Sequence, residues 1–258
     1  MNGAGAETES LRQPRLAAVV QWLGRFVFRF RDYLAPAVLV VILALTVPQH
    51  PFGSEAANRW VDVLGLLVAA LGQALRILVI GYAYIVRGGA GKQLAAPKLV
   101  CEGFYAHSRN PMYVGNILLL SGLAIIYHSR WVYVLGLPVL VAGLLAIVKA
   151  EETFLANKFG REYEEYCRRV NRFLPRLHGL RATMASMRFD WKRVLRKEYG
   201  TTFAWLSAAL FLLIWERLVH FGYAARRGEI DMLLLAYVPA GIAYGAVRWL
   251  KKSRRLDS

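Results

Sequence analysis

The chain has 258 residues, 57% of them hydrophobic, and it carries a formal net charge of +16 at pH 7. Soluble domains usually contain about 45–50% apolar residues, and the excess here falls in long blocks, which indicates a polytopic membrane protein. The positive residues flank these blocks and are not interleaved with exposed aromatic residues, so we interpret them as facing an anionic membrane surface and exclude a nucleic-acid partner.

Six apolar segments predict an all-α fold with about six transmembrane helices. They run over 33–47, 60–86, 112–127, 131–149, 202–222 and 231–250. A helix that spans a bilayer needs about 20 residues, so the first and third segments are short. The first could extend back into an amphipathic stretch that lies on the membrane surface. The third and fourth are joined by a tight turn at 128–130 and should form a helical hairpin.

Lysine and arginine residues are distributed unevenly between the connections. Segments 1–32, 87–111, 149–200 and 248–258 hold 27 of them, whereas 48–59, 127–130 and 223–231 hold 4. The two groups alternate along the chain, as six spans require. The positive-inside rule therefore places both termini and the 87–111 connection in the cytosol, for a protein of the inner membrane.

Ionisable residues inside apolar segments need a partner or a function. Arg76 lies toward the cytosolic end of the second segment, where it could extend to the membrane surface or contact an anion or cofactor. Glu216 and Arg217 are adjacent in the fifth segment, so their side chains should point about 100° apart. We expect these two to pair with other helices and not with each other.

The connection before the third segment contains RGGAGK and HSRNP. Gly89 and Gly91 would allow a ligand to approach the backbone, although a helix end explains them as well. Pro111 suits the first turn of a helix, and Asn110 before it should be extended. Arg109 and Asn110 then precede a helix start with free backbone donors at the membrane surface.

Two acidic residues, Glu151 and Glu152, close the fourth apolar segment. A carboxylate there is unfavourable because it lies near a helix C-terminus and the membrane. The pair therefore calls for a positive partner or a cationic ligand, unless it is solvated beside Lys149 and Lys158. Beyond it, apolar residues at three- and four-residue intervals predict an amphipathic helical stretch, interrupted at Gly160. These residues are Leu155, Phe159, Tyr163, Tyr166 and Val170.

Cysteine and histidine are too scattered to predict a metal site. Cys101 and Cys167 both fall in segments assigned to the cytosol, where a disulfide would not persist.

The stretch GFYAHSRNPMYVG, followed about 35 residues later by EETFLANKFGREYEEYCRRVNRFLP, resembles the isoprenylcysteine carboxyl methyltransferase and phospholipid methyltransferase family. These are integral membrane enzymes that use S-adenosylmethionine, and the resemblance covers residues 60–177. The family pattern is Arg-His-Pro-x-Tyr at a helix start, then a Glu-Glu pair after a helical hairpin. Asn110 stands where the family usually has His; it can replace an imidazole that forms hydrogen bonds, but not one that acts as acid or base.

The resemblance implies transfer of a methyl group from S-adenosyl-L-methionine to a membrane lipid or a prenylated or otherwise lipidated substrate, at the cytosolic face. It assigns catalytic roles to Arg109, Glu152 and Arg76, with the arginines orienting an anionic acceptor. The cofactor-binding residues that it implies are His107, Asn110, Pro111, Tyr113, Glu151, Glu152, Gly89 and Gly91.

The chain is expected to divide into three parts. Residues 1–58 form an amphipathic segment and the first span, 59–180 the methyltransferase-like core, and 181–258 an amphipathic segment with two further spans. Two other functions fit less well: an NADPH-dependent membrane reductase of the sterol-reductase type, which usually has Asn and an acid where this chain has Met112 and Asn116, and a non-catalytic lipid-binding membrane protein. The methyl acceptor and the oligomeric state stay open.

Overall fold

The regular structure of this chain is helical throughout the part that the computed structural model describes, which is residues 53–82, 96–256 and scattered positions between Trp22 and Gln49. In chain order the elements are α2 (Glu55–Tyr82), η2 (Gly103–Ala106), α3 (Pro111–Tyr127), the π-helical turn η3 (Val132–Gly136), α4 (Leu137–Phe159), α5 (Arg161–Arg169), α6 (Leu180–Ala185), α7 (Trp191–Ala225), α8 (Arg227–Leu235) and α9 (Tyr237–Lys252). These helices confirm the prediction of an all-α fold.

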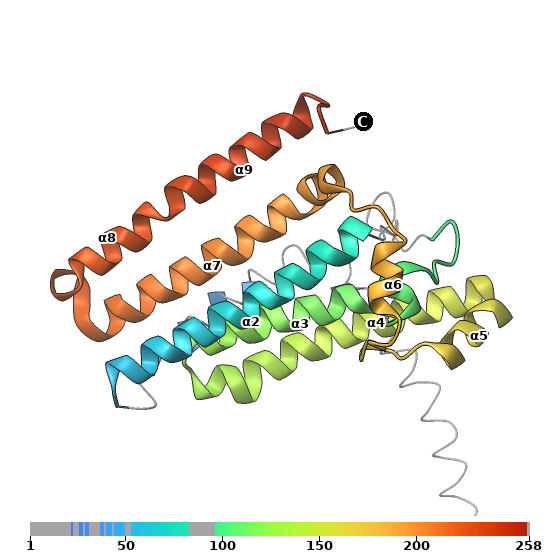
Figure 1. The fold of residues 1–258 in the computed structure, drawn as a ribbon. Helices are drawn as coiled ribbons and strands as arrows, with labels where there is room; N and C mark the ends of the chain where they lie inside the picture. The colour runs from blue at the N-terminus through green and yellow to red at the C-terminus, as the bar shows by residue number, and fades with distance from the viewer. Residues whose placement is uncertain are drawn as a thin grey trace, which may run out of the picture.

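Helices α2, α3, α4 and α7 lie side by side, and α8 and α9 return along α7 (Figure 1). On the right of Figure 1, α2 and α4 end, α3 and α7 begin, and α5 and α6 gather beside them. We call this the motif end of the bundle, because it holds both sequence motifs. The opposite end holds the start of α2 and the α7–α8 connection.

Among the residues that the structure describes, four helical stretches are long and apolar enough to cross a membrane: Glu55–Tyr82, Val132–Phe159, Trp191–Ala225 and Arg227–Lys252. Helix α3 is equally apolar but shorter, with 17 residues. Large apolar side chains such as Leu67, Val139 and Ile242 are exposed on these helices, as a lipid-facing surface requires. The protein is therefore a polytopic membrane protein, as predicted. Within the first predicted segment, 33–47, residues 33–36, 39 and 43 lie outside the described residues.

Glycines allow α2 and α3 to approach closely. A Cβ on Gly72 would lie 2.7 Å from the carbonyl oxygen of Gly115, and one on Gly65 would lie 2.8 Å from that of Gly122. The two glycines on each helix are seven residues apart, so they repeat on one face. Small residues of this kind let helix backbones pack tightly where the hydrophobic effect gives no driving force between helices. This contact places the start of α3 beside the end of α2.

Helix α4 is longer than the sequence predicts. It continues to Phe159 and ends at Gly160, which has a φ of 50° and confirms the predicted interruption. Glu151 and Glu152 therefore lie about two turns inside the helix, and not at its C-terminus. The unfavourable interaction with the helix dipole is confined to the last turn, so it does not apply to them. The predicted amphipathic stretch is confirmed by α5, where Tyr163 and Tyr166 are buried.

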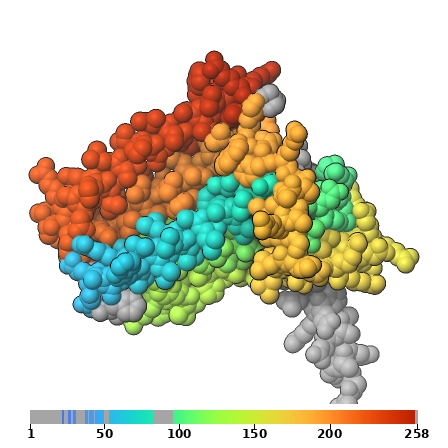
Figure 2. All heavy atoms as spheres, viewed as in Figure 1, coloured from blue at the N-terminus to red at the C-terminus, as the bar shows by residue number. Residues whose placement is uncertain are grey.

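The segment before α7 covers the motif end of α2. Leu180, Met184 and Met187 pack against a small cluster around Val79, and the Asp190 amide donates to the carbonyl of Gly81 at 3.0 Å. Figure 2 shows this segment as an amber layer over that end of α2. The C-terminal part of the chain thus packs directly on the core that carries the motifs.

Candidate active site

The start of α3 presents Asn110 to α4. Pro111 occupies the first turn, as predicted, and the carbonyl of Asn110 accepts from the amides of Tyr113 and Val114 at 3.1 and 3.3 Å. The side chain of Asn110 does not cap its own helix. Its Nδ2 donates instead to Glu152 Oε1 at 3.1 Å and to the carbonyl of Arg172 at 3.2 Å. Asn110 is buried, so these two bonds satisfy both hydrogens of its amide.

The Glu152 carboxylate is paired with two guanidinium groups. Arg172 Nε donates to Oε1 at 3.1 Å, and its Nη2 lies 2.8 Å from Oε2. Arg109 Nη1 lies 3.8 Å from Oε1. The positive partner left open by the sequence is therefore supplied by the protein itself. The alternative that the acidic pair is solvated beside Lys149 and Lys158 is wrong for Glu152, because its side chain is only 14% exposed.

Glu151 forms a second contact between the same two helices. Its side chain is buried, and the Tyr113 hydroxyl donates to its Oε1 at 2.8 Å. Asn110 and Tyr113 lie three residues apart at the start of α3, and the two acids are adjacent on α4. The structure thus brings both predicted motifs, HSRNPMY and EE, to one place.

Arg109 is anchored on its other side by α5. Its amide donates to the carbonyl of Asn171 at 2.9 Å, and its Nη1 donates to Cys167 Sγ at 2.6 Å. Burial lowers the pKa of Arg109, but Glu152 and Cys167 outweigh it and raise the pKa, so the group stays charged. Burial also raises the pKa of the neighbouring Tyr163, with Glu152 and Cys167 adding to it. The site therefore keeps a neutral phenol beside the Arg109 guanidinium group.

His107 contacts the segment after α5 and α6. Its Nδ1 lies 2.6 Å from the carbonyl of Arg176, so it donates there, and its Nε2 lies 2.9 Å from Thr183 Oγ1. The Ser108 hydroxyl donates to the carbonyl of Phe173 at 3.0 Å. These bonds tie the segment after α5 to the start of α3. The structure gives His107 a positioning contact with that segment.

Arg76 is separated from the acidic pair. Its guanidinium is buried between α2, α3 and α7, where Nε and Nη2 donate to Glu198 at 2.9 and 2.7 Å and Nη1 donates to Asn116. The interpretation as an arginine that reaches the membrane surface is wrong, because Glu198 holds the group inside the bundle. The anion that Arg76 contacts here belongs to the same chain. Gly89 and Gly91 lie outside the described residues.

Three contact residues were not identified from the sequence. Arg172 and Cys167 lie in the quoted motif, but nothing in CRRVNRF distinguishes Arg172 from its neighbouring arginines. Glu198 lies outside the resemblance, and its only signal is an acid in a strongly basic segment before an apolar span. All three were missed because their partners are far away in the sequence.

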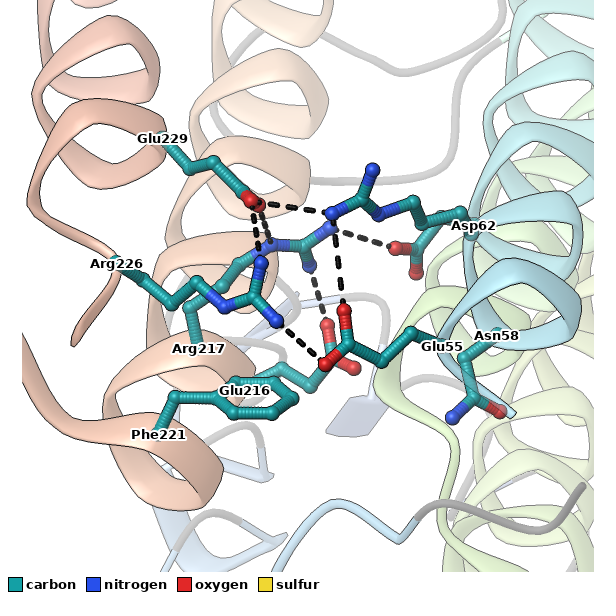
Figure 3. A pocket seen from close by; sticks show the side chains of 9 residues that line it. Glu55, Asn58, Asp62, Glu216, Arg217, Phe221, Arg226 and Glu229 are labelled. Carbon is teal, nitrogen blue, oxygen red and sulfur yellow. Dashed lines mark hydrogen bonds and ion pairs between the residues drawn. The ribbon is translucent and has the colours of Figure 1, made fainter. Parts of the chain in front are cut away.

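A polar pocket lies at the opposite end of the bundle (Figure 3). Arg217 contacts Glu216 directly and lies 3.0 Å from Asp62 on α2. The expected partner on another helix is confirmed for Arg217. The expectation that Glu216 and Arg217 do not pair with each other is wrong, because the long arginine side chain reaches its neighbour. Further ion pairs fasten α8 to α2 and to the α7–α8 connection: Arg59–Glu229, Arg226–Glu55 and Arg226–Glu229.

Comparison with known proteins indicates the same class of protein as the fold and the motifs, a membrane methyltransferase. The phospholipid methyltransferase family model matches residues 60–162. The cobalt-zinc-cadmium resistance protein CzcN of Cupriavidus metallidurans is 31% identical over 161 residues, which cover 62% of this chain and 71% of that protein. The nickel-cobalt-cadmium resistance protein NccN of Alcaligenes xylosoxydans xylosoxydans is 26% identical over 162 residues, with the same shares covered.

Plant methyltransferases are also similar to this chain. The probable protein-S-isoprenylcysteine O-methyltransferase of Oryza sativa subsp. indica is 29% identical over 127 residues, 47% of this chain and 65% of that protein. No solved structure matches the chain. This chain is a member of the isoprenylcysteine carboxyl methyltransferase and phospholipid methyltransferase family, which confirms the resemblance seen in its motifs.

Proposed function

We propose that this membrane methyltransferase uses S-adenosyl-L-methionine and transfers its methyl group to a lipid or lipidated acceptor at the cytosolic face. The observation that carries the proposal is the pair of contacts Asn110–Glu152 and Tyr113–Glu151. They join the start of α3 to α4, about two turns before α4 ends, and connect two motifs that are some 40 residues apart. The excess of lysine and arginine on the connections at this end supports a cytosolic orientation.

The residues fit the chemistry of the donor. S-adenosylmethionine carries its methyl group on a sulfonium. When the methyl group is transferred, the sulfur becomes a neutral thioether and is the leaving group. Such a donor also carries an ammonium, a carboxylate and ribose hydroxyls, and the site offers carboxylates, guanidinium groups and a phenol. The cofactor-binding set we propose is the one the motifs imply: His107, Asn110, Pro111, Tyr113, Glu151, Glu152, Gly89 and Gly91.

The work of the protein is then to position the two reactants in line and to exclude water. Tyr113 fixes the orientation of Glu151 through their hydrogen bond. Arg109 lies at the helix start, where its charge can orient an acceptor carboxylate or phosphate. In this proposal Arg76 helps to orient the methyl acceptor, and Glu198 holds its guanidinium group in place.

The test is titration calorimetry of the detergent-purified protein with S-adenosylhomocysteine, with NADPH as the alternative ligand. We expect binding of S-adenosylhomocysteine only, and a loss of affinity of about tenfold or more, or at least 1.4 kcal/mol, in Glu151→Ala and Glu152→Ala. Glu216→Gln is a matched control, since it changes a buried, arginine-paired acid at the opposite end and should bind normally.

Three results would contradict the proposal or the site assigned to it. Binding of NADPH in place of S-adenosylhomocysteine would favour the reductase function, and binding of neither would favour a non-catalytic lipid-binding protein. If both alanine variants bind S-adenosylhomocysteine like the wild type, the acidic pair is not part of the cofactor site.

A further inference from the structure

Arg172 is held by Glu152 along one edge of its guanidinium group. The Nε and Nη2 atoms face the two carboxylate oxygens at 3.1 and 2.8 Å, which is a side-on, two-point contact. The guanidinium also lies over the ring of Phe173, with its Cζ 5.3 Å from the ring centre. A planar group held by two bonds and a ring has little freedom to turn, so its direction is set by the site.

The second edge of the same group is open. A guanidinium has five N–H donors, and the contact with Glu152 uses those on Nε and one side of Nη2. Across the described part of the chain, Nη1 of Arg172 has no hydrogen-bond partner. The Arg172 side chain is 37% exposed, compared with 18% for Arg109 on the other side of Glu152. Arg172 therefore keeps a free Nη1/Nη2 edge on a side chain that is partly exposed.

The local charge favours an anion at this edge. The Glu152 carboxylate faces two guanidinium groups, those of Arg172 and Arg109, so it does not neutralise both of them. A carboxylate is planar and matches two parallel N–H groups of an arginine edge. A lone amine or a neutral hydroxyl would gain much less from the same position.

We propose that the free edge of Arg172 binds a carboxylate, and we assign it to the amino-acid end of the methyl donor. This rests on the proposed function. Glu152 is then a positioning residue that aims Arg172, in place of a direct ligand for the donor ammonium. Glu151, oriented by Tyr113, is left to contact the ammonium or the ribose hydroxyls.

The experiment compares two ligands that differ in one group: S-adenosylhomocysteine and its decarboxylated form. The wild type should prefer S-adenosylhomocysteine by about ten- to a hundredfold, the range of one charge-assisted, two-point contact. Arg172→Gln should lower the affinity for S-adenosylhomocysteine to that of the decarboxylated form, whose own affinity should not change. Arg172→Lys, which keeps the charge but not the two-point geometry, should fall between them.

Arg168→Gln is the matched control, because it removes the same charge from an exposed position four residues earlier on the same segment. It should bind both ligands like the wild type. Thermal unfolding of each variant in detergent separates a loss of the ligand contact from a loss of folded protein. A general loss of structure would weaken both ligands equally, whereas the proposal requires that only the carboxylate-bearing one weakens.

The remaining outcomes identify the source of the carboxylate or reject the site. If S-adenosylhomocysteine binding is unchanged in Arg172→Gln but the apparent KM for an acceptor in lipid extracts rises at least tenfold, the edge binds an acceptor carboxylate. If neither the donor preference nor the acceptor KM changes, Arg172 is only a partner of Glu152 and the inference is overturned. If the wild type binds neither nucleoside, the proposed function itself fails.

Discussion

At the scale of single residues, the site depends on which partner each polar group finds. Asn110 is the clearest case, because it stands where the family usually has a histidine. Its amide uses both hydrogens, one on Glu152 and one on the carbonyl of Arg172. A hydrogen-bonding role therefore suffices to explain the residue at this position, and the site geometry needs no general base from it.

The hydrogen bond between Tyr113 and Glu151 gives a first prediction. Tyr113→Phe keeps the ring and removes only the hydroxyl that donates to Glu151 at 2.8 Å. A hydrogen bond to a charged group contributes about 1.5–3 kcal/mol. We expect the affinity for S-adenosylhomocysteine, measured by calorimetry, to fall about ten- to a hundredfold while the protein stays folded. An unchanged affinity would show that the orientation of Glu151 does not matter for the donor.

Tyr163 gives a prediction for alkaline pH. Burial first, then Glu152 and Cys167, raises the pKa of its hydroxyl above the ordinary value of 10.0. Because the hydroxyl ionises more easily in the unfolded chain, its contribution to stability is complete below about pH 10 and is lost as the pH rises through the folded-state pKa. We expect the stability of Tyr163→Phe in detergent to fall less steeply above about pH 10 than that of the wild type.

Tyr223→Phe serves as the control for this comparison, because its ring is 47% exposed at the opposite end of the bundle. It should follow the wild-type curve. Superimposable curves for Tyr163→Phe and the wild type, recorded by circular dichroism against pH, would refute the raised pKa.

At the scale of elements, the glycine contact between α2 and α3 determines how the start of α3, which carries part of the site, is positioned along the bundle. A Cβ on Gly122 would lie 2.5 Å from the backbone of α2, at Ala69 N and Gly65 O. Backbone atoms cannot move aside as a flexible side chain can, so the helices would have to separate. That separation would also shift the start of α3, with Asn110 and Tyr113, relative to α4.

We therefore expect Gly122→Ala to lower the free energy of unfolding in detergent by about 1–3 kcal/mol and to weaken S-adenosylhomocysteine binding. Gly245→Ala on α9 is the matched control: nothing lies within 4 Å of its Cβ, so it should be neutral or slightly stabilising. Equal stabilities of the two variants would mean that α2 and α3 do not pack through their glycines.

At the scale of the whole molecule, the C-terminal helices are fastened to the core at both ends. At the opposite end Arg217 and Arg226 join α2 to the α7–α8 connection and α8. Nearer the motif end, Glu198 on α7 pairs with Arg76 on α2, and both side chains are buried. Between these contacts, Ala209, Leu212 and Leu213 of α7 share a hydrophobic cluster with α3.

The buried ion pair gives a fourth prediction. Glu198→Ala leaves the Arg76 guanidinium without its carboxylate inside the bundle, and removal of one partner of a buried pair costs about 3–5 kcal/mol. The double variant Arg76→Met with Glu198→Leu removes both charges and should be much less destabilised. The single variants Arg76→Met and Glu198→Leu complete the cycle, and unfolding in mixed micelles measures the free energy of unfolding of each protein. If the double variant loses the sum of the two single losses, the residues do not act as a pair.

The sequence alone was sufficient for the class of fold and for the family. Long apolar blocks specify helices in a membrane because every backbone polar group there must be satisfied within the segment. The two motifs identified the family because they are local patterns in a defined order. Pro111 and Gly160 marked a helix start and a helix end correctly, since proline and glycine act through their own backbone geometry.

Only the tertiary structure decided the partners of the charged groups. Glu152 could have met solvent, a ligand or any of several arginines, and the packing of α4 against the segment after α5 selected Arg172 and Arg109. Arg76 pairs with Glu198, which lies 122 residues later in the chain on another helix. Such choices depend on which side chains become neighbours once the helices pack, and composition and periodicity carry no information about contacts at that separation.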